Sequence, residues 1–139
     1  MRTVDVGSRL PQMSPADNEK ELAPRAILIV DDEPSIGFLL TEMLQSTGHP
    51  ILTAGSVSEA LTHLKSRPIA VLIVDVQLAG TDGIAFLQQA LEVDSRLLSI
   101  VMTGHGNIEL AVRAMKSGAA DFLTKPFEVE LVRQSVSRL

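Results

Sequence analysis

Acidic side chains follow two of the apolar segments of this sequence. The run at 26–30 (AILIV) ends in Asp31, Asp32 and Glu33, and the run at 69–74 (IAVLIV) ends in Asp75. Adjacent carboxylates at the end of a buried strand repel one another, so such a cluster persists only where a cation or a proton compensates the charge. Magnesium prefers oxygen ligands and is commonly bound by one or two carboxylates. We therefore interpret the two junctions as two halves of a magnesium site.

A hydroxyl and an amine occupy corresponding positions later in the chain. Thr103 follows the apolar segment 97–102, and Lys125 follows the segment 120–124, directly before Pro126. The carboxyl ends of parallel strands share one edge of a sheet, and ligands bind beyond that edge. A hard cation, a nucleophilic carboxylate, and a hydroxyl and an ammonium that hold oxygens are suited together to phosphoryl transfer.

The spacing of apolar residues alternates between strand and helix from residue 26 onward. Strands are predicted at 26–30, 51–54, 69–74, 97–102 and 120–124, with helical spacing at 36–44, 57–64, 84–91, 108–115 and 129–139. Gly48 and Gly118 are suited to end the first and fourth helices, and Ser56 with Glu59 forms a capping box for the second. Five strand–helix units with short connections predict an α/β fold, a doubly wound, five-stranded parallel sheet with helices on both faces.

The composition is typical of a single soluble domain. The chain has 139 residues, of which 45% are hydrophobic, no cysteine and a formal net charge of -5. Its apolar runs are too short to span a membrane, and its negative charge gives no electrostatic basis for binding nucleic acid. Residues 1–24 are polar and interrupted by prolines, so we expect a flexible N-terminal leader before a domain at 25–139. Without a signal-type segment, the predicted location is cytoplasmic.

Four segments together resemble the receiver domains of two-component response regulators. They are IVDDEP at 29–34, VD at 74–75 with DG at 82–83, MTG at 102–104, and DFLTKPF at 121–127. The resemblance covers residues 26–139 and implies a flavodoxin-like (βα)5 sheet with strand order 2-1-3-4-5. It implies that Asp75 accepts a phosphoryl group from a sensor histidine kinase or phosphotransfer protein. Asp32 would bind Mg²⁺ directly, Asp31 mainly through water, and Gln77 through its backbone carbonyl.

The same resemblance assigns the signalling residues. Lys125 would pair with the acyl phosphate, Thr103 would take one of its oxygens, and Phe122 would turn inward as Thr103 moves. The fourth helix, fifth strand and fifth helix would form the face that controls an output domain or partner, or that pairs two copies in a homodimer. Such a domain is not an enzyme beyond its own phosphorylation and dephosphorylation, and it does not itself bind DNA. The segment from Thr103 to Phe127 is most similar to nitrogen-regulation and nitrogen-fixation receivers, whereas Ala79 stands where the family often has proline.

Other interpretations remain open from the residues. Thr103 could cap the following helix, Lys125 could be a solvated surface residue, and Phe122 could belong to the core. A haloacid-dehalogenase-like phosphatase also uses an aspartate nucleophile and magnesium, but it normally has a second aspartate two residues later, where this chain has Gln77. A nucleotide-binding module would need a glycine-rich phosphate loop after the first strand, where this chain has acids.

Overall fold

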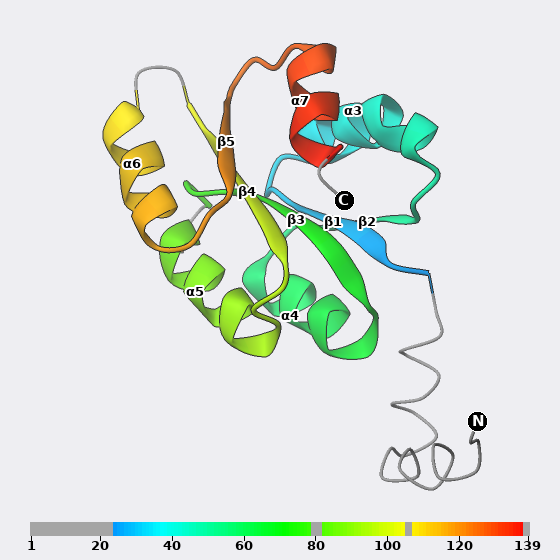
Figure 1. Cartoon of the computed structure of the whole chain (residues 1–139), viewed down its shortest axis with the longest axis horizontal. Coiled ribbons are helices and arrows are strands. Elements are labelled where there is room, and N and C mark those ends of the chain that lie inside the picture. Colours follow the sequence, from blue (N-terminus) through cyan, green and yellow to red (C-terminus); the bar gives the residue numbers. More distant parts are fainter. Residues whose placement is uncertain (1–23, 79–81, 105–106, 138–139) are drawn as a thin grey trace, which may run out of the picture.

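A computed structural model describes residues 24–78, 82–104 and 107–137, which form a five-stranded parallel sheet between two layers of helices (Figure 1). The strand order is β2-β1-β3-β4-β5, which confirms the predicted class and topology. In chain order the elements are β1 (Ala26–Val30), α3 (Pro34–Leu44), a 3-10 turn (Gln45–Thr47), β2 (Ile51–Ala54), α4 (Val57–Ser66), β3 (Ile69–Asp75), α5 (Gly83–Val93), β4 (Leu98–Thr103), α6 (Ile108–Lys116), β5 (Asp121–Thr124) and α7 (Val129–Val136). The predicted leader at 1–24 and the loop position Ala79 lie almost wholly outside the described residues, so both stay predictions.

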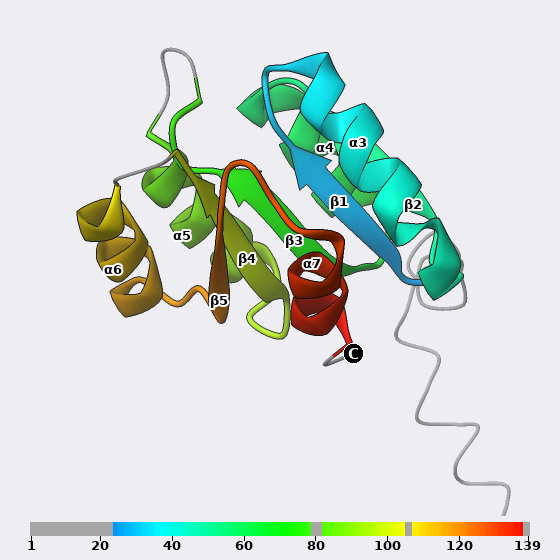
Figure 2. The same cartoon turned by 90° about the horizontal axis from the view of Figure 1, so that it is seen from above.

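Alternation along the strands assigns side chains to the two faces of the sheet. Strand residues such as Ile29 and Ile73 pack under α3 and α7, whereas their neighbours Val30 and Val74 pack under α4, α5 and α6. Figures 1 and 2 show these two layers on opposite sides of the sheet. The central strands are apolar on both faces because both are covered, as is usual for parallel sheets. None of the helices in the described ranges is long and apolar enough to cross a membrane.

Local signals end the helices largely as predicted. Gly48 and Gly118 have positive φ angles of 80° and 116°, a conformation that glycine adopts without strain. The first helix differs in detail, because α3 ends at Leu44 and the chain tightens into the 3-10 turn before Gly48. The capping box also differs. Ser56 Oγ accepts from the N–H of Glu59 as expected, but Glu59 Oε1 accepts from the N–H of Gly55, one residue before Ser56.

Gly83 fixes the position of α5 against the end of β3. A Cβ at this residue would lie 2.4 Å from Val76 Cα and 2.6 Å from the carbonyl oxygen of Asp75. The N–H of Gly83 donates to the Val76 carbonyl at 3.2 Å. The absence of a side chain therefore allows the helix to start in direct contact with the backbone that carries Asp75.

Candidate functional site

Three carboxylates meet at the carboxyl edge of the sheet. One oxygen each from Asp31, Asp32 and Asp75 lies within 4.8 Å of the others. Asp31 and Asp75 are buried, each 5% exposed, whereas Asp32 faces solvent. Oxygen donors at this spacing, with one side open to water, fit Mg²⁺, which keeps several water ligands when bound to proteins. The residues predicted as the two halves of a metal site are therefore brought together.

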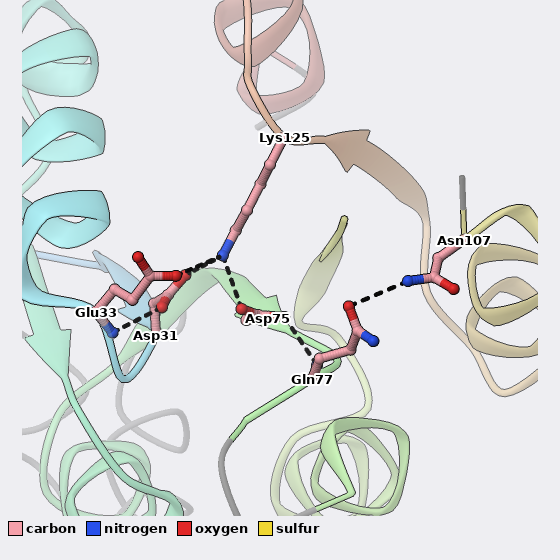
Figure 3. Close-up of polar contacts among 6 residues, drawn as sticks. All are labelled: Asp31, Glu33, Asp75, Gln77, Asn107 and Lys125. Carbon is pink, nitrogen blue, oxygen red and sulfur yellow. Dashed lines mark hydrogen bonds and ion pairs between the residues drawn. The ribbon is translucent and has the colours of Figure 1, made fainter. Parts of the chain in front are cut away.

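The Lys125 ammonium bridges the two buried carboxylates (Figure 3). Its Nζ donates to Asp31 Oδ2 at 2.8 Å and to Asp75 Oδ2 at 2.7 Å, and it lies 3.9 Å from Glu33 Oε1. The Lys125 side chain is only 19% exposed, so the interpretation of a solvated surface lysine is wrong. Strand alternation explains the convergence. Asp31, Asp75 and Lys125 each follow a residue of the α3 and α7 face by two positions.

Burial sets the electrostatics of this group of charges. Desolvation raises the pKa of Asp31 above its ordinary value, and the hydrogen bonds from Lys125 and from the Glu33 N–H only partly offset it. Desolvation also disfavours the charged form of Lys125, but the hydrogen bonds to Asp31 and Asp75 outweigh it and raise the pKa of the amine. The raised pKa of Asp31 and the raised pKa of Lys125 are consistent with each other, because a single amine forms ion pairs with two carboxylates. The amine stays protonated and compensates only part of the negative charge.

Backbone amides orient the same carboxylates. Asp31 Oδ1 accepts from the Glu33 N–H at 2.9 Å, and Asp75 Oδ1 accepts from the Gln77 N–H at 2.8 Å. Each aspartate therefore uses one oxygen for the backbone two residues later and the other for Lys125, which restricts its rotamer before any ligand binds.

Thr103 lies at the end of β4 with a hydroxyl that has no hydrogen-bond partner within the described part of the chain. Its residue is 1% exposed, and its carbonyl accepts from the Lys125 N–H at 2.9 Å. An unpaired buried hydroxyl costs free energy unless a ligand satisfies it. Ser99 also has an unpartnered Oγ, but it lies near the start of β4, away from the carboxyl edge. Because α6 begins after Asn107, Thr103 is not its cap, and that alternative is wrong.

Phe122 lies outward in this structure. It is 37% exposed, so it is not a core residue here. Its register partner on β4 is Val101, and Thr124 pairs with Thr103. Phe122 therefore lies on the same face of the sheet as Thr103, on the neighbouring strand, and this is the face covered by α4, α5 and α6.

A further polar contact joins the site to α6 and was not anticipated from the sequence. Asn107 Nδ2 donates to Gln77 Oε1 at 3.2 Å, across 30 positions of chain (Figure 3). Asn107 directly precedes a helix, and an asparagine at such a position is ordinarily expected to cap it. The local signal therefore predicts a different partner from the one observed.

A comparison with protein families identifies the family to which this chain belongs. Residues 27–137 match the family model described as the response regulator receiver domain. The chain is a response regulator receiver domain. The receiver domain is 33% identical over 116 residues to the C4-dicarboxylate transport transcriptional regulatory protein DctD of Rhizobium meliloti (strain 1021), covering 84% of this chain and 25% of DctD. It is 38% identical over 106 residues to the nitrogen assimilation regulatory protein NtrX of Azorhizobium caulinodans (strain ATCC 43989 / DSM 5975 / JCM 20966 / LMG 6465 / NBRC 14845 / NCIMB 13405 / ORS 571), covering 75% of this chain and 23% of NtrX.

Solved structures agree with the sequence comparison. The crystal structure of the receiver domain of NtrX from Brucella abortus superposes with a TM-score of 0.77 at 36% identity, covering 81% of this chain and 95% of that one. These matches confirm the resemblance to nitrogen-regulation receivers and do not support the phosphatase alternative. The receiver domain spans about a quarter of the length of DctD and NtrX. The activities of those longer proteins are therefore not assigned to this chain.

Proposed function

We propose that this receiver domain accepts a phosphoryl group on Asp75 from a phosphohistidine of a sensor kinase or phosphotransfer protein, in a Mg²⁺-dependent reaction. The observation that carries the proposal is the partly buried Lys125 ammonium held between Asp31 and Asp75, with Asp32 beside them at the carboxyl edge. Asp75 is the residue to which the resemblance to receiver domains assigns the acceptor role, and it ends the central strand of the sheet with its Oδ2 2.7 Å from Lys125 Nζ.

In the transfer step a carboxylate oxygen of Asp75 forms a bond to phosphorus as the phosphorus–nitrogen bond of the donor breaks. The electron pair of that bond returns to the imidazole nitrogen, which takes up a proton, and Asp75 becomes an acyl phosphate. Lys125 already donates to Asp75 Oδ2 at 2.7 Å. Its ammonium is therefore close enough to donate to the phosphoryl oxygens and to stabilise the negative charge that they carry.

Asp31, Asp32, Asp75 and the backbone carbonyl of Gln77 would hold the magnesium ion, with the phosphoryl group beside it. Bound there, the metal would neutralise charge on the phosphoryl oxygens during transfer. The Asp32 residue is exposed to solvent, whereas Asp31 is buried. This difference supports direct ligation by Asp32 and mainly water-mediated ligation by Asp31.

The change of conformation after phosphorylation would depend on the unpartnered hydroxyl of Thr103. Donation from Thr103 Oγ1 to a phosphoryl oxygen would satisfy a buried group that has no partner in the described residues. Its movement would leave room for Phe122 to turn inward on the same face. A shift from mostly inactive to mostly active needs a differential of about 3 to 5 kcal/mol, within the reach of charge-assisted contacts to Thr103 and Lys125.

Two apolar surfaces support the proposed partners. Phe38 on α3 is 71% exposed and borders a depression of about 380 Å³ that also includes Asp31 and Asp32. A kinase domain presenting a phosphohistidine would contact this side. The face formed by α6, β5 and α7 also exposes apolar side chains, namely Ile108, Val112, Met115, Phe122, Val129 and Leu131. This face would contact an output domain or a second copy of the chain.

Phosphorylation by a small donor tests the acceptor directly. With acetyl phosphate and magnesium chloride, intact-mass measurement should show one added phosphoryl group that hydroxylamine removes, and Asp75→Asn should remain unlabelled. Asp94→Asn is the matched control, because Asp94 lies after α5 and away from the acidic cluster. Its Oδ1 accepts a hydrogen bond from the Arg96 N–H. Undiminished labelling of Asp75→Asn would refute the assignment. Repeated turnover of a phosphate ester, in place of a single labelling, would favour phosphatase activity.

A further inference from the structure

Asn107 has the backbone position of a helix cap but not the side-chain role. Its carbonyl accepts from the Ala111 N–H at 3.2 Å, the first bond of α6, yet its side chain makes no capping bond. The caps of α4 and α5 show the usual arrangement. Ser56 accepts from the Glu59 N–H, and Asp82 Oδ1 accepts from the N–H groups of Ile84 and Ala85.

The backbone of Asn107 explains the difference. Its φ and ψ are -98° and 52°, whereas ψ is 162° at Ser56 and 109° at Asp82. An N-cap side chain reaches the following amides from an extended backbone, so Asn107 would have to rotate about ψ before it could cap α6. In the observed conformation the side chain instead donates to Gln77 Oε1 at 3.2 Å.

This bond connects both sides of the phosphorylation site. Gln77 is held to Asp75 Oδ1 through its own N–H. Asn107 is held to the carbonyl of Gly104, next to Thr103, through its N–H at 3.2 Å. A Cβ on Gly104 would lie 3.4 Å from Gln77 Oε1 and 3.8 Å from Asn107 Nδ2. The side-chain bond therefore lies against the backbone that would have to move with Thr103.

We propose that Asn107 is a positioning residue with two alternative partners. In the unphosphorylated protein it binds Gln77 and holds the start of α6 beside the acceptor segment. When Asp75 is phosphorylated, the movement of Thr103 displaces Gly104, the bond to Gln77 breaks, and the Asn107 side chain rotates to cap α6. This inference rests on the proposed phosphorylation of Asp75 and adds the element by which the change would reach α6. The competition between the two partners is a property of the unphosphorylated protein and can be tested without phosphorylation.

Hydrogen exchange of the Glu109 and Leu110 amides, measured by NMR on the full chain, reports capping of α6. Gln77→Leu removes the acceptor while keeping the backbone N–H and carbonyl, so Asn107 is released to cap. We expect about five-fold slower exchange of these amides than in the wild type, the usual size of a capping effect. Asn107→Ser, which can cap but is too short to reach Gln77, should give the same protection. The double variant Gln77→Leu with Asn107→Ala should lose it.

Ser56→Ala calibrates the assay, because it removes an observed cap and should accelerate exchange at Glu59. Wild-type protein with Mg²⁺ and beryllofluoride, a mimic of the acyl phosphate, should reach the protection of Gln77→Leu, and Gln77→Leu should change little further at these amides. Equal exchange in Gln77→Leu and wild type without the mimic would overturn the proposed competition. No gain in wild type with the mimic would overturn the coupling. Acetyl phosphate labelling of the same samples judges the proposed function separately, since it does not depend on Asn107.

Discussion

Removing the Lys125 amine should destabilise the receiver domain by an amount that magnesium largely restores. In Lys125→Met a linear side chain of similar length remains, but Asp31 and Asp75 lose the hydrogen bonds of 2.8 and 2.7 Å to Nζ. The two carboxylates have oxygens within 4.8 Å of each other, and without the amine no positive charge lies between them. At an effective dielectric constant of about 20, two unit charges at this separation repel by about 3.5 kcal/mol.

Two effects limit this cost. Protonation of a carboxyl with an ordinary pKa costs about 4 kcal/mol at neutral pH, and it costs less for Asp31, whose pKa is raised by burial, so protonation of Asp31 sets a ceiling below that figure. The Lys125 side chain is 19% exposed, so water can replace part of what the amine supplied. We therefore expect a loss of about 3 kcal/mol in the free energy of unfolding without metal, or about 10 °C in melting temperature for a domain of this size.

Urea unfolding followed by circular dichroism, in EDTA and in excess magnesium chloride, measures the effect. Because Mg²⁺ supplies a cation to the same carboxylates, the difference between Lys125→Met and wild type should fall to less than half when the metal is added. Lys65→Met, on the exposed end of α4, is the matched control and should be neutral. Asp75→Asn should be neutral or stabilising in EDTA, since it removes one of the two like charges and keeps an acceptor for Lys125.

Two results would refute the reasoning. An equal loss in EDTA and in magnesium would mean that Lys125 acts through packing rather than charge. A loss in Asp75→Asn as large as in Lys125→Met would mean that repulsion between the carboxylates is not what the amine relieves.

Three further predictions follow from the same geometry. Asp32→Asn should weaken Mg²⁺ binding more than Asp31→Asn in a fluorescence or calorimetric titration; the reverse order would exchange their proposed roles. Thr103→Ala should still be phosphorylated, but the NMR chemical-shift changes on adding beryllofluoride should be confined to residues near Asp75. Changes that extend to α6 and β5, as expected in the wild type, would show that the conformational change does not depend on Thr103. Gly83→Ala should cost about 2 to 3 kcal/mol in urea unfolding, because its Cβ would lie 2.4 Å from the Val76 backbone, whereas Gly55→Ala, with nothing nearer than 3.9 Å, should be nearly neutral.

Many of the helices and strands were predictable because their signals are local. Apolar runs such as 69–74, the glycines at 48 and 118, and the Ser56 cap act within a few residues, and the structure confirms the strands and most of these helix ends. The strand order is not a local property; it was implied by the resemblance to receiver domains, and the structure confirms it. The exceptions are also local. The 3-10 turn after α3 and the contact of Glu59 with Gly55 differ from the prediction by a residue or a few, where competing hydrogen bonds are nearly equivalent.

The sequence by itself determined which chemical groups reach the carboxyl edge, because each strand ends where its apolar run ends. It could not determine which of those groups touch. The Lys125 contacts join residues 94 and 50 positions apart, and the Asn107 contact joins residues 30 apart. Such contacts depend on sheet register and on which face each strand end presents, and neither is encoded in the spacing of one segment. Only the tertiary structure therefore decided that Lys125 bridges Asp31 and Asp75, that Phe122 lies outward, and that Asn107 binds Gln77 rather than its own helix.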